Sequence, residues 1–127
     1  MAGELESAAN ELVARLDSMD VDALMEMASD DIQGVDELSR RWLRGEDEVE
    51  GYLRQLAGAL GDVRTQLRDV DERVWGETGF LTCWIEQDYT LEGKAQHVSA
   101  PTTIVFHRED GDWKVALFHS IPLPEQA

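Results

Sequence analysis

The sequence contains one cysteine, Cys83, only two lysines and three prolines, and it lacks a hydrophobic run long enough to cross a membrane. A single cysteine cannot form an internal disulfide bond, so nothing indicates an oxidising compartment. A membrane-spanning helix would need roughly 18 consecutive apolar residues. The segment Met1–Glu6 has neither the basic nor the apolar part of a signal peptide. We therefore expect a cytoplasmic protein that makes no contact with membranes.

Positive charge is scarce as well. The chain has 27 acidic residues against 11 lysines and arginines, a net charge of −16, and its first 37 residues hold 11 acids beside a single base, Arg15. Such a surface repels phosphate backbones, which argues against nucleic-acid binding. Arg40, Arg41 and Arg44 form the one basic cluster. They could hold an anionic group of a small ligand, but we favour pairing with the acids around them.

The first part of the chain has helical periodicity. A length of 127 residues is typical of one domain, to which we assign residues 1–127. Residues 4–17 form an amphipathic helical pattern, and Asp20 predicts the N-cap of a second, short helix that carries Leu24, Met25 and Ala28. Residues 29–44 fit a short strand or an irregular connection. A third helix begins with three acids at Glu46 and stops at Gly61; its apolar stripe consists of Val49, Tyr52, Leu53, Leu56 and Leu60.

The second part of the chain is typical of β-strands joined by tight turns. Gly-containing turns separate the predicted strands, which cover residues 63–75, 80–91, 95–108 and 113–121. Helices that precede a run of hairpin-connected strands indicate the α+β class. We expect three N-terminal helices packed against one face of a curved, mostly antiparallel sheet.

Alternation along the strands predicts which face of the sheet is buried. The odd positions of strand 80–91 and the even positions of strand 95–108 are the more apolar sets, and Pro101 predicts an edge or a bulge because proline cannot donate to a ladder. The last strand is apolar on both faces, with Val115 and Leu117 on one and Ala116 and Phe118 on the other. Its second apolar face needs a cover, and a partner subunit is the simplest one. We expect a homodimer that forms through the outer face of the sheet.

Three features together resemble the SnoaL-like family of the nuclear transport factor 2-like superfamily. They are the order of three helices before a meander, the segment Trp42–Val49, and the segment Asp110–Val115 followed by His119–Pro122. The resemblance spans nearly the whole chain. It implies a cone, in which a strongly bent sheet wraps around the helices and an apolar pocket opens at the wide end, usually in a homodimer. The family includes steroid isomerases, polyketide cyclases, dehydratases, epoxide hydrolases and modules with no catalytic role, so the fold alone does not define the reaction.

Proton transfer in such a pocket would need a histidine or a carboxylate beside an apolar wall. His119 is the first candidate because it alternates in step with Val115 and Leu117, although a structural histidine in the core or interface is the favoured alternative. Asp36 is the second candidate, with a capping or solvated loop acid as its alternative. For ligand binding we select one tryptophan, two tyrosines and one leucine: Trp42, Tyr52, Tyr89 and Leu117.

The remaining histidines and the cysteine do not indicate a metal site or a cofactor. We expect His97 on the outer side of the sheet, His107 in solvent and Cys83 as an inert buried thiol. The spacing of the histidines does not indicate a metal site, and no motif for a cofactor is present. The favoured hypothesis is a protein that binds a small apolar molecule and acts as an isomerase, cyclase or hydratase by proton transfer. The alternative is a non-catalytic homodimeric binding or assembly module.

Overall fold

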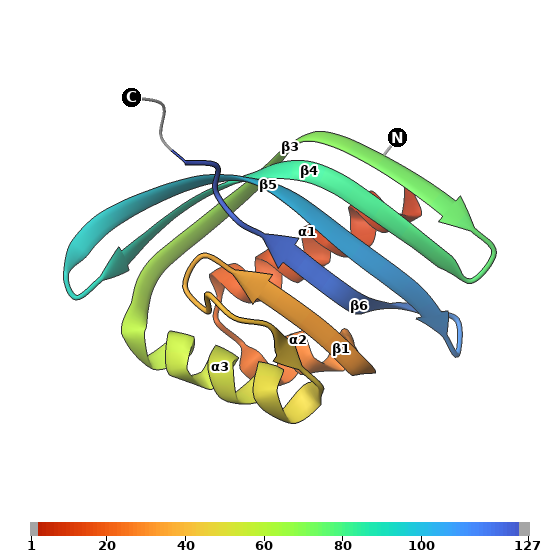
Figure 1. Ribbon diagram of the computed structural model, residues 1–127, viewed down its shortest axis with the longest axis horizontal. Helices are drawn as coiled ribbons and strands as arrows, with labels where there is room; N and C mark the ends of the chain where they lie inside the picture. Colours follow the sequence, from red (N-terminus) through yellow and green to blue (C-terminus); the bar gives the residue numbers. More distant parts are fainter. Residues whose placement is uncertain (1–2, 125–127) are drawn as a thin grey trace.

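The computed structural model describes residues 3–124. Three helices and six strands make up this part of the chain (Figure 1). In chain order they are α1 (Glu4–Asp17), α2 (Val21–Glu26), β1 (Ala28–Asp36), β2 (Leu43–Arg44), α3 (Glu46–Ala59), β3 (Leu60–Trp75), β4 (Thr78–Leu91), β5 (Lys94–Glu109) and β6 (Asp112–Ser120).

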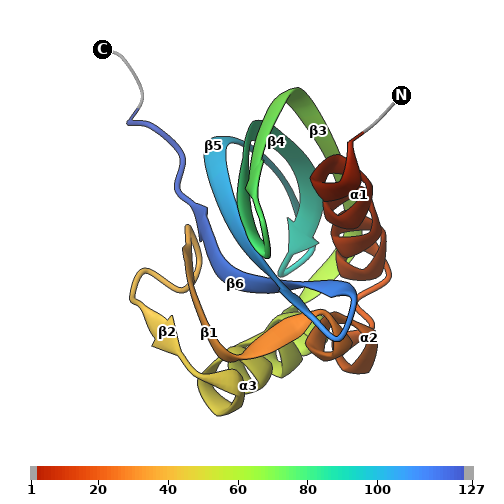
Figure 2. The ribbon, with the colours of Figure 1, turned by 90° about the vertical axis from the view of Figure 1, so that its right-hand side faces the viewer.

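The strands form one strongly curved sheet in the order β2-β1-β6-β5-β4-β3. Neighbouring strands are antiparallel except β1 and β6, which are parallel. In Figure 2 α1 lies on one side of the curved sheet, and α2 lies below it on the same side. The helices therefore cover the inner, concave face, and the opposite face of the sheet is called the outer face here. The expected α+β fold is confirmed.

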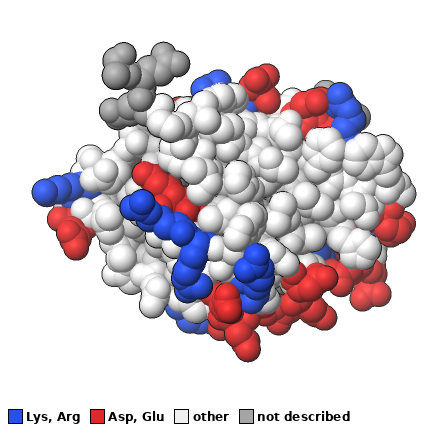
Figure 3. Space-filling model, viewed as in Figure 1, with Lys and Arg blue, Asp and Glu red and all other residues white. Residues whose placement is uncertain are grey.

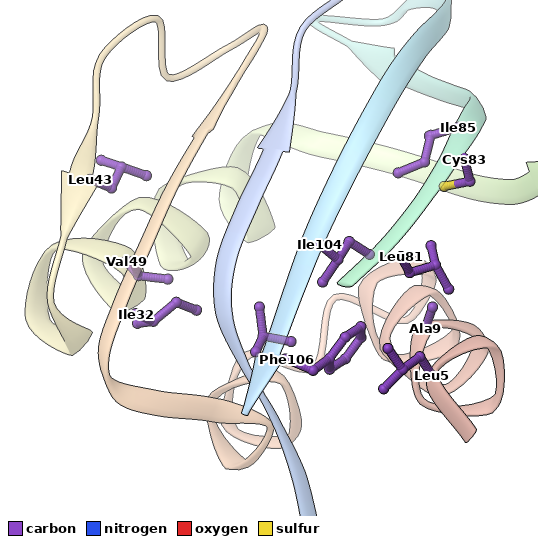
Figure 4. Packing of buried hydrophobic residues seen from close by; sticks show 11 residues of the cluster. Leu5, Ala9, Ile32, Leu43, Val49, Leu81, Cys83, Ile85, Ile104 and Phe106 are labelled. Carbon is purple, nitrogen blue, oxygen red and sulfur yellow. The ribbon is translucent and has the colours of Figure 1, made fainter. Parts of the chain in front are cut away.

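The buried faces of the central strands agree with their alternation. Leu81, Cys83 and Ile85 on β4 are buried, as are Ile104 and Phe106 on β5. Figure 4 shows Leu81, Ile104 and Phe106 on the side of α1, close to Leu5 and Ala9. Burial raises the pKa of the Cys83 thiol to about 11, which keeps it in its unreactive neutral form.

Pro101 lies at a local edge, although β5 is a central strand. The ladder between β5 and β6 ends at the pair Thr102–Ser120, so Pro101, one residue before Thr102, lies just beyond the part of β5 that pairs with β6. On its other side Pro101 faces Trp84 of β4. Proline has no backbone N–H to donate, and here none is needed because β6 does not extend alongside Pro101.

Two element boundaries differ from the sequence-based predictions. Asp20 does cap α2, accepting a hydrogen bond from the backbone N–H of Ala23 at 3.1 Å, but Ala28 already belongs to β1. Residues 28–36 form a full nine-residue strand because they pair with β6, a contact that local patterning does not reveal. α3 ends at Ala59 with Leu60 as its C-cap, so Gly61 does follow the end of the helix, but Leu60 and Gly61 already belong to β3, which begins three residues earlier than predicted as it pairs with β4.

The start of α1 is stabilised by an acid from a distant strand. Glu72 on β3 accepts hydrogen bonds from the backbone N–H groups of Leu5 and Glu6, at 3.3 and 3.0 Å. These N–H groups have no partner within the helix, and the positive end of the helix dipole favours a carboxylate there. The contact also ties α1 to the far end of the sheet.

We expect Glu72→Ala to lower the free energy of unfolding by about 1–2 kcal/mol, because two helix N–H groups lose a charged acceptor. Urea denaturation followed by circular dichroism measures the change. The control is Glu77→Ala, which removes an acid from the exposed turn between β3 and β4 and should change stability by less than about 0.5 kcal/mol. Equal effects of the two substitutions would contradict the capping role.

Candidate functional site

An apolar cavity lies on the inner side of the sheet, between the helices and strands β1 and β6. Its volume is about 120 Å³. The lining is almost entirely aliphatic and comes from all three helices, with Gln33, Asp36 and Tyr52 as its polar members. The apolar wall consists mainly of Leu12, Leu16, Leu24, Met25, Ile32, Leu43, Val49, Leu53, Leu56, Val115 and Phe118.

A second cavity of about 60 Å³ adjoins the first and extends toward β3, β4 and β5. The two cavities share four lining residues, namely Leu16, Asp36, Leu56 and Phe118. Three of these are flexible apolar side chains, so a change of rotamer can join the two spaces. A dry apolar cavity of about 150 Å³ accommodates benzene, which sets the scale of a ligand that fits here.

Asp36 and Tyr52 form the polar corner of this cavity. Asp36 is the last residue of β1, and its Oδ1 atom accepts hydrogen bonds from the backbone N–H groups of Leu38 and Ser39, at 3.0 and 2.8 Å. Tyr52, on α3, donates its hydroxyl proton to the same Oδ1 atom at 2.6 Å. The alternative that Asp36 is a capping acid therefore accounts for its hydrogen bonds with the backbone. In addition, Asp36 lines the cavity and accepts a hydrogen bond from Tyr52 there.

The two cavity tyrosines keep their protons. Burial raises the pKa of Tyr52 above its usual value, and the negative charge of Asp36 adds to this effect. Burial also raises the pKa of Tyr89, with further contributions from Glu37 and Asp36. Tyr89 lines the second cavity from β4 with only 5 % of its surface exposed. This corner thus contains two acids, from the end of β1 and the turn after it, and two tyrosines, from α3 and β4.

His119 does not share this corner. The ladder between β5 and β6 pairs Phe106 with Val115 and then Val105 with Leu117, so Ala116 is an extra residue on β6. Such a β-bulge reverses the alternation of the residues that follow. The expectation that His119 faces the same way as Val115 is therefore wrong: Phe118 lines the inner cavities, while His119 lines an open depression on the outer face.

Two of the predicted ligand-binding residues also lie outside the inner cavities. Trp42 is 40 % exposed, and its ring lies 6.0 Å from that of His119. Leu117 is half-buried and pairs with Val105 on β5, on the side reached after the bulge. The outer depression beside His119 has a volume of about 600 Å³ and is bounded by Trp84, Thr103 and residues 121–124. The predicted residues thus divide into an inner group (Asp36, Tyr52 and Tyr89) and an outer group (Trp42, Leu117 and His119).

The other charged candidates are exposed. His97 lies between Asp88, at 2.8 Å, and Glu86, at 3.3 Å. The hydrogen bond with Asp88 is the main cause that raises the pKa of His97, and the hydrogen bond with Glu86 adds to it. In the basic cluster, Arg41 forms an ion pair with Glu48 at 3.8 Å. This is the kind of pairing with acids that we favoured over anion binding. Within residues 3–124, no cluster of three or more His, Cys, Asp or Glu is arranged to hold a metal ion. In the same range, no helix is long and apolar enough to cross a membrane.

Phe118, Leu16 and Glu37 also line the site, although the sequence does not single them out for it. Alternation assigns Phe118 to the face opposite Val115, because the bulge at Ala116 leaves no local signal in the sequence. The helical pattern indicates only that Leu16 belongs to an amphipathic helix. The acid next to Asp36 was visible in the sequence, and a pair of acids directly after a strand is the signal that could have drawn attention to it.

The fold and the cavity define a class: a curved sheet that, together with three helices, encloses an apolar interior with a polar corner. The SnoaL-like domain family matches residues 5–124, and the chain belongs to this family. Comparison with curated protein sequences finds no match.

Solved structures with this fold carry several kinds of names. A calcium/calmodulin-dependent protein kinase II association domain, provisionally named as such, from Xanthomonas campestris has a TM-score of 0.85 at 18 % identity and covers 98 % of this chain and 91 % of its own. A ketosteroid isomerase-like protein from Erwinia carotovora has a TM-score of 0.80 at 17 % identity, with 94 % of each chain covered. A provisionally named dehydratase of the NTF2-like family from Streptomyces avermitilis has a TM-score of 0.83 at 19 % identity, also with 94 % of each chain covered. At these identities the likeness establishes the fold and leaves the function open.

Proposed function

We propose that the protein binds a small, largely apolar molecule in its inner cavity and that Asp36 accepts a proton from a carbon atom next to the polar end of that molecule. The observation that carries this proposal is the hydrogen bond from Tyr52 to Asp36 in the wall of a mostly apolar cavity. A carboxylate held in a fixed position beside an apolar wall is the arrangement that a general base requires. Names such as isomerase and dehydratase among proteins of the same fold support proton transfer as the type of chemistry.

The cavity residues have separable roles in this proposal. Asp36 is the base. Tyr52 is a positioning residue, because its hydroxyl donates a hydrogen bond to Asp36 and holds the carboxylate in place. Tyr89 approaches the same corner from β4 and can donate a hydrogen bond to a ligand oxygen. His119 has no part in this reaction, since it lies on the outer face.

A fragment screen by thermal shift, followed by calorimetric titration of the hits, tests the proposal. Narrowing the cavity with Leu53→Phe is expected to weaken binding by about tenfold or more, because a filled cavity cannot accept the ligand without strain. The control is His119→Ala, which should leave the affinity unchanged. If His119→Ala abolished binding and Leu53→Phe had no effect, the ligand would occupy the outer depression and the proposal would fail.

A second function is favoured by the charge distribution: self-association through the outer face of the sheet. Figure 3 looks onto this face, and much of its middle and right-hand part carries few charged side chains although the chain has a net charge of −16. Half-buried apolar residues lie there, including Phe80, Trp84, Val105 and Leu117. We propose that two copies pair through this surface, which also gives Trp42 and His119 a structural role. Light scattering coupled to gel filtration measures the mass in solution, and a monomer at micromolar concentration would refute the pairing.

A further inference from the structure

The two inner cavities contain negative charge with no positive charge to balance it. Asp36 lines both cavities and Glu37 lines the second one. Among the residues that the structure describes, no lysine, arginine or histidine lines either cavity. A ligand with a carboxylate or phosphate group would therefore lose its hydration and meet like charge at the polar corner, which is strongly unfavourable.

Asp36 and Tyr52 present hydrogen-bond acceptors to the cavity. The proton of Tyr52 points to Asp36, so the phenol oxygen is left as an acceptor. Because the pKa of Tyr52 is raised, its proton stays in this bond. An oxyanion in the cavity would thus lack the Tyr52 donor, whereas a ligand that donates hydrogen bonds would find both Asp36 and Tyr52 ready to accept.

Tyr89 adds a further polar group to the second cavity. The residue is only 5 % exposed and lines this cavity, and its hydroxyl forms no hydrogen bond with residues 3–124. The hydroxyl is therefore free to bind a ligand or a water molecule there. The ring of a tyrosine can also contact a cation with its face. Tyr89 lies near enough to Asp36 and Glu37 for their charges to act on it.

We propose that the ligand is a small amine in its protonated form, with an apolar body in the larger cavity and its ammonium group on Asp36. This inference rests on the proposed function of the cavity and names the chemical class that it takes. An ammonium group supplies the charge that the corner lacks and up to three donors for its acceptors. The strongly acidic surface adds to the selection, because it concentrates cations around the protein and steers them at low ionic strength.

Three probes with the same ring and different polar groups separate the contributions of shape and charge. Cyclopentylamine, cyclopentanol and cyclopentanecarboxylate share a ring that suits a cavity of this volume, and they carry a cation, a neutral donor and an anion at neutral pH. In calorimetric titrations at low salt we expect the amine to bind about tenfold more tightly than the alcohol, or better, and the carboxylate not to bind measurably. The advantage of the amine should shrink as salt is added.

Substitution of Asp36 tests where the selectivity arises. Asp36→Asn keeps the shape of the side chain, and we expect it to bring the affinities of amine and alcohol to within about a factor of three of each other. The matched control is Asp112→Asn, which removes the same charge from the exposed start of β6 and should preserve the preference. Circular dichroism verifies that both variants are folded.

The outcomes distinguish this inference from the proposed function beneath it. If alcohol and amine bind equally well to the unchanged protein, or if the carboxylate binds best, the amine is wrong while the cavity remains a binding site. If Asp112→Asn removes the preference as fully as Asp36→Asn does, the selectivity comes from the general charge of the surface and the assignment to Asp36 fails. If none of the three probes binds, both proposals fail.

Discussion

Phe106→Ala is expected to lower the free energy of unfolding by about 3–5 kcal/mol, the largest loss among the single substitutions considered. Phe106 is completely buried at the centre of the core (Figure 4). It lies on β5 opposite Gly79 of β4 and Val115 of β6, so its ring contacts both neighbouring strands as well as the layer of α1. Truncation removes the apolar contacts and leaves a cavity that rigid strands cannot close. Urea denaturation at several protein concentrations measures the loss without interference from self-association.

The matched control is Trp75→Ala, which truncates a larger aromatic side chain that is 62 % exposed at the end of β3. We expect a loss below about 1 kcal/mol, because little buried surface is removed. Phe106→Leu should fall between the two, at about 1–1.5 kcal/mol, since most of the volume is kept. If the exposed tryptophan proved as important as Phe106, the position of the core in this structure would be incorrect.

The fold was predictable because its local signals agree with its long-range contacts. The stripe on residues 46–60 is periodic over several turns, and Asp20 is followed three residues later by the N–H group that it caps. The hairpin turns at Glu92–Gly93 and Asp110–Gly111 place residues with positive φ where tight turns require them. Strands β4 and β5 alternate along most of their length, so their buried faces could be assigned from the sequence.

The errors arose where pairing between distant segments decides the structure. β1 contains adjacent acids at Asp30 and Asp31, a pattern that does not indicate a strand, yet its parallel partner β6 holds it extended. The bulge at Ala116 is the second case. It depends on the register between β5 and β6, and neither strand alone contains the information. One extra residue was enough to separate His119 from the face of Val115, with which its alternation in the sequence groups it.

The sequence predicted several residues of the candidate site but not how they are arranged. It indicates Asp36 as an acid in an irregular segment and Tyr52 as part of the apolar stripe of a helix. Their contact joins the end of β1 to the middle of α3 across 16 positions in the chain, and no periodicity links the two. The sequence therefore predicted which chemical groups were available, whereas the fold was needed to show which of them meet.

Leu117→Glu is expected to convert the proposed homodimer into a monomer at micromolar concentration. Leu117 lies on β6, the third of six strands in the sheet, and faces outward beside Val105. In a dimer formed through this face, each copy would bury a carboxylate among apolar side chains, which costs several kcal/mol per charge. Two chains with a net charge of −16 already repel each other, and the substitution adds to this repulsion. We expect the dissociation constant to rise by about 1,000-fold or more.

Sedimentation velocity over a range of protein concentrations measures this change, and Gln55→Glu is the matched control. Gln55 lies on the exposed surface of α3, away from the outer face of the sheet. The control adds the same negative charge and should change the dissociation constant by less than about threefold. Dissociation by both variants would mean that total charge governs assembly, and a dimer that persisted in a folded Leu117→Glu protein would place the interface elsewhere. Ligand binding in the inner cavity should be the same in both variants, because the cavity and the outer face lie on opposite sides of the sheet and neither residue lines the cavity.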